Sequence, residues 1–175
     1  MNLRDIFETK ENMKSLYVSR PVLNKDAIRL WAKDNGFASC LPPSDFHVTL
    51  IYSKKMFDWD KSDPDSNIIY VDPSDEHRSI EQFGSDAVVL EIQSDALQTR
   101  WKELIDLGAH SSFPTYRSHI TITYEGMPSE VVPYNGEIVL GPEIWEEIVE
   151  DYNHEDTVEL KLSIESDTGS ANQMD

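Results

Sequence analysis

The chain lacks features that extracellular and membrane proteins usually have. It contains one cysteine, Cys40, among 175 residues, so no disulfide can form within it, and this suits a reducing cytosol. No stretch approaches the roughly 20 apolar residues that a membrane-spanning helix needs. Residues Met1 to Lys14 are charged and lack the apolar segment of a signal peptide. We therefore expect a cytosolic protein that does not enter a membrane.

Basic residues are also scarce. Lys and Arg number 15 against 33 Asp and Glu, which gives a net charge of −18. A protein that binds a long nucleic acid normally presents a broad basic surface to many phosphates, so that class is disfavoured. Most of the acid is explained by solubility. A small ligand with few phosphates, held in a local pocket, remains compatible with this charge.

One hexapeptide pattern, His-apolar-Thr-apolar-x-Tyr, occurs twice. The copies are His47-Val48-Thr49-Leu50-Ile51-Tyr52 and His119-Ile120-Thr121-Ile122-Thr123-Tyr124. Polar residues alternate with β-branched and aromatic ones, which predicts strands. Because strand side chains change face at every residue, the His and Thr of each copy share one face. We expect them to face a common cleft, while the inward face carries Val48, Leu50, Tyr52, Ile120, Ile122 and Tyr124.

The flanking segments indicate an α+β fold with an internal duplication. A strand, a helix and a motif strand follow one another twice, and the motifs are 72 residues apart, from position 47 to 119. Helices are predicted at 24–36 (after Asn24) and 94–108 (after Ser94), with a short acidic one at 142–149. Further strands are predicted at 15–19, 67–71, 78–83, 87–92, 134–140 and 157–164. We expect one domain over 1–164, with a polar composition at 165–175 that favours disorder.

The paired motifs suit acid–base chemistry at a phosphate. Two histidines titrating near neutrality can act as general base and general acid across one scissile bond. The hydroxyls of Thr49 and Thr121 can donate to the non-bridging oxygens as charge develops on them. One copy alone would be read as ordinary exposed strand residues, but two copies in matching contexts favour catalysis by His47, Thr49, His119 and Thr121.

A metal site is the competing use of two histidines. It needs a third and usually a fourth ligand. Cys40 lies in a predicted loop, and no carboxylate sits beside either motif at a ligand-like spacing. We therefore predict neither a metal nor another cofactor.

His47-Val-Thr49-Leu and His119-Ile-Thr121-Ile resemble the paired signature of the 2H phosphoesterase superfamily. The flanking text over about residues 14 to 150, including Tyr17-Val-Ser-Arg20 and Leu41-Pro-Pro-Ser-Asp-Phe-His47, is most similar to its phage anti-CBASS phosphodiesterase branch. The resemblance implies a bilobed fold, with two pseudo-symmetric antiparallel sheet halves and flanking helices around a central cleft. It also implies cleavage of cyclic di- or trinucleotide messengers in the cytoplasm of a host bacterium, through attack by a ribose 2′-OH.

The resemblance and the strand patterns add candidate ligand-binding residues. Tyr17 matches a base-contacting tyrosine of that branch, and Trp59 and Phe83 are alternative stacking residues. Arg117 shares the face of His119 and can meet a phosphate. Glu143, Glu146 and Glu147 form an acidic cluster that would ordinarily be a solvated helix face. Glu147 is the candidate among them for accepting a hydrogen bond from a base edge or for orienting a histidine. The residues leave open a phosphodiesterase for RNA 2′,3′-cyclic ends, a non-catalytic nucleotide sponge, the oligomeric state and the role of the loop 56–66.

Overall fold

The structure, a computed structural model, describes residues 12–149 and the pair 158–159. A six-stranded antiparallel sheet has the order β5-β6-β7-β3-β1-β9. The two motif strands are neighbours at its centre, so each half of the sheet contributes three strands. The strands are β1 (Met13–Pro21), β3 (His47–Asp58), β5 (Arg78–Phe83), β6 (Ala87–Ile92), β7 (His119–Thr123) and β9 (Ile144–Glu146). The predicted two-halved α+β fold is confirmed, with the halves joined in one continuous sheet.

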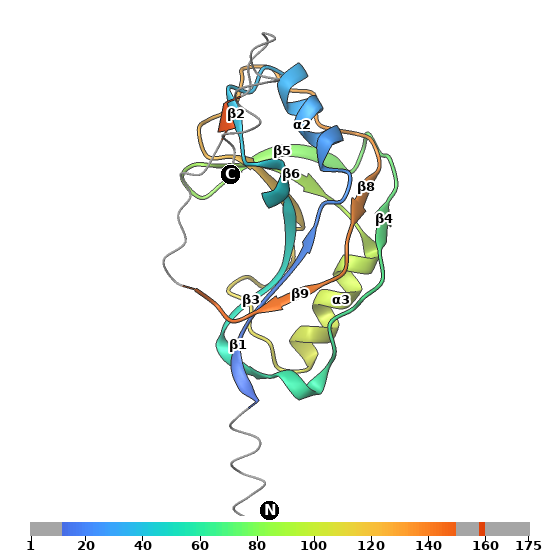
Figure 1. Cartoon of the computed structure of the whole chain (residues 1–175), viewed down its shortest axis with the longest axis vertical. Coiled ribbons are helices and arrows are strands. Elements are labelled where there is room, and N and C mark those ends of the chain that lie inside the picture. The colour runs from blue at the N-terminus through green and yellow to red at the C-terminus, as the bar shows by residue number, and fades with distance from the viewer. Residues whose placement is uncertain (1–11, 150–157, 160–175) are drawn as a thin grey trace, which may run out of the picture.

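Smaller elements complete the fold. Two further antiparallel pairs join β4 (Ile69–Val71) to β8 (Ile138–Leu140) and β2 (Ser39–Cys40) to β10 (Val158–Glu159). The helices are α2 (Lys25–Asp34) and α3 (Asp95–Asp106), with short 3-10 turns η1 (Pro43–Asp45) and η2 (Trp59–Lys61). Helix α3 and the β4–β8 pair lie on one side of the curved sheet, to the right in Figure 1, and its concave side faces left.

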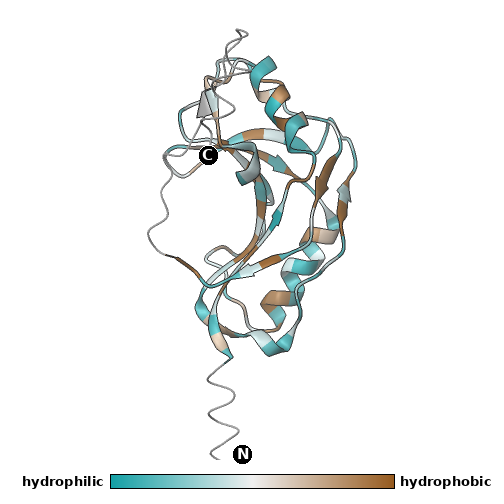
Figure 2. Cartoon of the chain, viewed as in Figure 1, coloured by the Kyte–Doolittle hydropathy of each residue, from teal (hydrophilic) through white to brown (hydrophobic). Residues whose placement is uncertain are grey.

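The alternation of side chains separates a core face from a cleft face. On β1, Leu16, Val18 and Arg20 are fully buried, whereas the intervening Tyr17 and Ser19 line a groove on the other face. Apolar and polar residues recur in turn along the strands and helices in Figure 2. This arrangement presents polar groups to the concave side while the apolar ones form the core.

Both main helices form near the predicted positions, but different contacts hold their N-termini. Ser94 caps α3, because its hydroxyl accepts from the backbone N–H of Leu97 at 3.3 Å. Asn24 precedes α2 without a side-chain cap. Its amide instead bonds the carbonyl of Glu137 and the N–H of Val139, so it ties the start of the helix to the chain around β8.

The acidic helix predicted at 142–149 is wrong. Residues Ile144–Glu146 form the edge strand β9, paired with β1 from Tyr17 to Ser19. Trp145 lies edge-on to Phe57 and Trp59, so tertiary packing and backbone pairing override the helical composition. Of the strand predicted at 157–164, positions 158–159 form β10. The remainder, and the tail predicted at 165–175, lie outside the described residues.

The loop after β3 is held against the core face by a buried ionic cluster. Arg20, which is fully buried, pairs with Asp65 and lies 3.6 Å from the carboxylate of Glu143. Glu143 also accepts from Arg100 on α3 at 2.8 Å and from the backbone N–H of Asp65. Because Arg20 points away from the cleft face, this part of the 56–66 loop is anchored on the side opposite the histidines.

Candidate functional site

The register of the two motif strands brings the paired motifs together. Val48 is the antiparallel partner of Ile120, and both side chains are fully buried. Counting one residue in each direction places His47 opposite Thr121 and Thr49 opposite His119 on the cleft face. The histidines therefore occupy diagonal corners of a four-residue square. Two steps along a strand and one strand spacing across separate them, which corresponds to about 8 Å between their Cα atoms.

Each motif strand carries a β-bulge directly after its threonine. Against β1, Leu50 is the extra residue between Thr49 and Ile51. Against β6, Ile122 is the extra residue between Thr121 and Thr123. A bulge inserts one unpaired residue and re-aims those that follow. The pseudo-symmetry of the halves thus extends to the same irregularity at the same motif position.

The first bulge corrects the predicted orientation of Tyr52. Leu50 and Ile51 are both buried, and Tyr52 is 46 % exposed instead of pointing inward. Its ring lies edge-on to Tyr17, its cross-strand partner, with ring centroids 5.6 Å apart. Strict alternation could not show this, since the extra residue shifts the pattern by one. Tyr124, in the other half, is partly buried against the core.

Both imidazoles are oriented by a backbone carbonyl two residues earlier in the chain. His47 Nδ1 lies 2.7 Å from the carbonyl oxygen of Asp45, and His119 Nδ1 lies 2.8 Å from that of Arg117. A carbonyl only accepts, so Nδ1 carries the hydrogen in each ring. The reactive nitrogen is therefore Nε2 in both cases, and it exchanges its proton without a change at Nδ1.

The two histidines differ in what surrounds the rest of the ring. His47 Nε2 is 3.0 Å from the hydroxyl of Tyr17. The ring of His119 instead meets Phe83 edge-on, with centroids 4.7 Å apart. Burial lowers the pKa of His119, and the positive charges of His47 and Arg117 add to this, whereas the carbonyl of Arg117 and the charge of Glu91 oppose it.

Arg117 lies beside the site in a fixed arrangement. Its guanidinium donates two hydrogen bonds to Glu91, at 2.7 and 2.8 Å, and covers the ring of Phe83 at 4.6 Å. Glu91 is the cross-strand partner of His119. The phosphate contact expected of Arg117 stays a prediction, and the ion pair shows that its charge is partly matched already.

A groove of about 290 Å³ opens next to His47. Its walls include Tyr17, Ser19 and Asp45, together with Ile144 and Glu146 from β9. Glu146 is the cross-strand partner of Tyr17 and so shares its face. Of the described residues that line this groove, the acidic ones are Asp45 and Glu146. The predicted Glu147 follows directly after β9, and its contact with a ligand stays a prediction.

Other predicted residues are placed by packing. Trp59 lies edge-on to Trp145 and donates to the carbonyl of Ser15, which is a structural role.

The backbone of Thr49 is held from outside the sheet, because the hydroxyl of Tyr116 donates to its carbonyl at 2.7 Å. Tyr116 in turn stacks on Trp101 of α3.

Glu91 and Glu146 are site-lining residues that the sequence interpretation did not select. The sequence pattern could have indicated Glu91, since it is the single charged residue in the apolar run Ala87–Ile92. Glu146 belongs to the predicted acidic cluster, but Glu147 was preferred within it, because the predicted helix at 142–149 gave the wrong periodicity.

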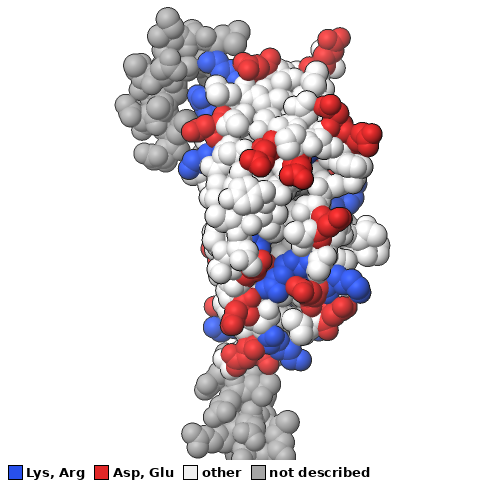
Figure 3. Space-filling view, turned by 90° about the vertical axis from the view of Figure 1, so that its right-hand side faces the viewer, with Lys and Arg blue, Asp and Glu red and all other residues white. Residues whose placement is uncertain are grey.

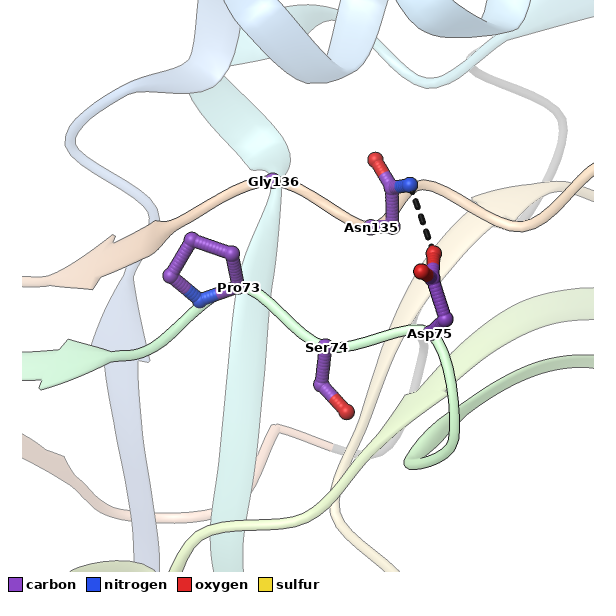
Figure 4. Close-up of a pocket in the computed structure, with 5 residues that line it drawn as sticks. All are labelled: Pro73, Ser74, Asp75, Asn135 and Gly136. Atoms are coloured by element: carbon purple, nitrogen blue, oxygen red, sulfur yellow. Dashed lines mark hydrogen bonds between the residues drawn. The ribbon is translucent and has the colours of Figure 1, made fainter.

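A second hollow lies apart from the motifs. It measures about 350 Å³ and is formed where the β4–β5 connection meets the chain before β8. Figure 4 shows its five lining residues, with Asn135 donating to Asp75 at 2.7 Å. It contains neither histidine, so we place the site at the motifs.

The residues that the structure describes contain no group of three or more His, Cys, Asp and Glu side chains arranged to hold a metal ion. None of their helices is long and apolar enough to cross a membrane.

Comparison with solved structures supports the fold. The chain superposes on a crystal structure of a phosphoesterase with a TM-score of 0.57 at 13% sequence identity, covering 86% of this chain and 96% of the other. Apo LigT of E. coli gives a TM-score of 0.56 at 13% identity, covering 85% and 95%. At this identity the likeness concerns the fold, and it confirms the predicted 2H phosphoesterase-like architecture.

Comparison with curated sequences is closer. An anti-CBASS protein Acb1 of Sphingomonas paeninsulae is 41% identical over 150 residues, 79% of this chain and 24% of that protein. One of Caulobacter sp. (strain RHG1) is 39% identical over 146 residues, 78% and 23%. One of Vibrio phage KVP40 is 34% identical over 85 residues, 49% and 54%. The chain thus spans about a quarter of the length of the two bacterial relatives. Since the family model for anti-CBASS protein Acb1 matches residues 14–155, the chain belongs to the Acb1 family.

Proposed function

We propose that this protein is a metal-independent phosphodiesterase that opens the 3′–5′ bonds of cyclic oligonucleotide immune messengers, such as 3′,3′-cGAMP. The observation that carries the proposal is the Val48–Ile120 register, which puts His47 and His119 at diagonal corners on one face of the sheet. Two imidazoles in that position can supply both the base and the acid of a transesterification. Membership of a family named for its action against CBASS supports messenger nucleotides as the substrate class.

The reaction uses the substrate's own nucleophile. One histidine takes the proton of the ribose 2′-OH, which attacks the adjacent phosphorus and forms a 2′,3′-cyclic phosphate. The other histidine gives a proton to the departing 5′ oxygen. Thr49 and Thr121 flank the same space and donate to the non-bridging oxygens, where negative charge is stabilised in the transition state. Opening of the ring would silence the receptor of the messenger in the cytoplasm of a host bacterium.

Charge supports a small ligand over a long nucleic acid. The chain has a net charge of −18. On the face that carries β4, β8 and α3, basic side chains are interspersed with acidic ones (Figure 3). Such a surface repels an extended phosphate backbone, while a compact ligand needs only the groups in the cleft.

The test is incubation with 3′,3′-cGAMP in the presence of EDTA, followed by chromatography. We expect a linear product that ends in a 2′,3′-cyclic phosphate, at the same rate with and without the chelator. Recovery of intact ligand in a stoichiometric complex would contradict the proposal in favour of a sponge. Cleavage confined to 2′,3′-cyclic RNA ends would contradict it in favour of an RNA-end phosphodiesterase.

A further inference from the structure

The two halves of the site are equivalent in backbone but unequal in side chains. Val18 pairs with Ile51, and Val88 pairs with Thr123, each two positions past a motif threonine. The residue before each valine therefore occupies the same place in its half. In the first half this residue is Tyr17, and in the second it is Ala87.

Because Ala87 on β6 is small, a residue of β5 contacts the second histidine, His119, in its place. Ala87 has only a methyl group, and its cross-strand partner Phe83 on β5 fills the position beside His119, with ring centroids 4.7 Å apart. In the first half, Tyr17 itself reaches His47 with its hydroxyl, at 3.0 Å. One histidine thus has a hydrogen-bonding neighbour and the other has a hydrocarbon edge.

The hydroxyl of Tyr17 fits both protonation states of His47. With Nδ1–H held by the carbonyl of Asp45, the neutral ring presents an Nε2 lone pair, and the hydroxyl donates to it. The protonated ring presents Nε2–H, and the hydroxyl oxygen accepts from it. Phe83 can do neither for His119, so its side of that ring favours the uncharged form.

The charged groups around each ring are consistent with this difference. Near His119 lie Glu91 on β6, Arg117 in the preceding residues and His47 across the strand pair, and burial outweighs the carboxylate so that the pKa of His119 is lowered. Near His47 lie Tyr17 and, in the adjoining groove, Asp45 and the carboxylate of Glu146 on β9.

From this asymmetry we infer that His119 is the general base and His47 the general acid, with Tyr17 the residue that positions the proton on His47. The inference rests on the proposed phosphodiesterase function and assigns the two roles within it.

The proton balance is closed within one turnover. His119 Nε2 takes the 2′-OH proton, the O2′–P bond forms and the P–O5′ bond breaks. The departing O5′ takes the proton from His47 Nε2, after which the hydroxyl of Tyr17 donates to the neutral ring. His119 then loses its proton to solvent and His47 regains one, which restores the starting state.

The test uses a leaving group that needs no acid. In 3′,3′-cGAMP with sulfur in place of a bridging 5′ oxygen, the thiolate departs without protonation, so a general acid becomes dispensable and a general base does not. We expect the cleavage rate of His47→Ala to fall at least about 10²-fold on the oxygen substrate and less than about fivefold at the sulfur-bridged bond. The cleavage rate of His119→Ala should fall at least about 10²-fold on both.

Tyr17→Phe keeps the ring and removes only the hydroxyl. Its cleavage rate should fall about tenfold on the oxygen substrate and stay nearly unchanged at the sulfur-bridged bond. A merely structural role would lower both rates alike. Tyr52→Phe, at the neighbouring exposed tyrosine, is the matched control and should leave both rates unchanged. Rescue of His119→Ala by sulfur would overturn the assignment, and equal losses of Tyr17→Phe on both substrates would overturn the role of Tyr17. A wild-type protein that cleaves neither compound would overturn the proposed function itself.

Discussion

At the scale of single residues, the site depends on two imidazoles whose Nδ1 atoms are fixed and whose Nε2 atoms are available for proton transfer. The carbonyls of Asp45 and Arg117 fix them in the same way. Equivalent backbone geometry with different neighbours, Tyr17 and Phe83, is how an internal duplication can yield two distinct roles.

Loss of either imidazole should remove one proton-transfer step. We expect His47→Ala and His119→Ala each to lower turnover of 3′,3′-cGAMP by at least about 10²-fold, measured by chromatography at saturating ligand. His77→Ala is the control, since His77 lies on an exposed turn outside the motifs. A single variant at position 47 or 119 with wild-type turnover would refute the acid–base roles.

The titration of His119 can be followed directly. Because burial lowers its pKa and the Glu91 carboxylate partly opposes that, NMR of the imidazole should give a midpoint below the usual value of about 6.5. Glu91→Gln removes the opposing charge and leaves Arg117 unmatched, so the midpoint should move still lower. A rise in the midpoint in Glu91→Gln would show that the electrostatic interpretation is wrong.

At the scale of elements, the sequence predicts those helices and strands whose signals are local to one segment. Strands at 78–83 and 87–92, the helix after Ser94 and both motif strands were predictable, because period and capping signals are local. The bulges at Leu50 and Ile122 were not predictable, since an extra residue is defined only against the partner strand. The same holds for β9, whose edge position beside β1 depends on Trp145 packing.

The contact between Tyr116 and β3 tests how the motif strand is held. Tyr116→Phe leaves the carbonyl of Thr49 without its 2.7 Å donor and should reduce the free energy of unfolding by about 1–2 kcal/mol, measured by urea denaturation. Tyr70→Phe is the control, because that side chain is 62% exposed on β4. Equal stability of the Tyr116 variant and wild type would contradict this role.

At the scale of the whole molecule, the ionic cluster of Arg20, Asp65, Glu143 and Arg100 joins β1, the 56–66 loop, the residue before β9 and α3 behind the sheet. Composition showed the abundant acid but could not show which carboxylates are buried. Glu143 was read as part of a solvated face, and its side chain is fully buried. Cluster membership depends on tertiary contacts between residues that lie 43 to 123 positions apart in the sequence.

The cluster should make stability depend on pH. Burial alone would raise the pKa of Asp65, but bonds from the Asn67 N–H and Arg20, with the charge of Arg20, hold that pKa below its ordinary value. A lowered pKa in the folded state contributes stability at higher pH that is lost as pH falls below about 4. Asp65→Asn should therefore weaken the fall in stability between about pH 4 and pH 2, measured by thermal unfolding. An unchanged acid dependence would contradict this.

The central claim is that His47 and His119 flank one phosphate. A crystal structure with the 2′-deoxy form of 3′,3′-cGAMP, which lacks the nucleophile, tests it most directly. The account predicts one phosphate with oxygens within hydrogen-bond distance of Nε2 of both histidines. A ligand whose phosphates contact only one of the two rings, or that lies elsewhere on the protein, would contradict it.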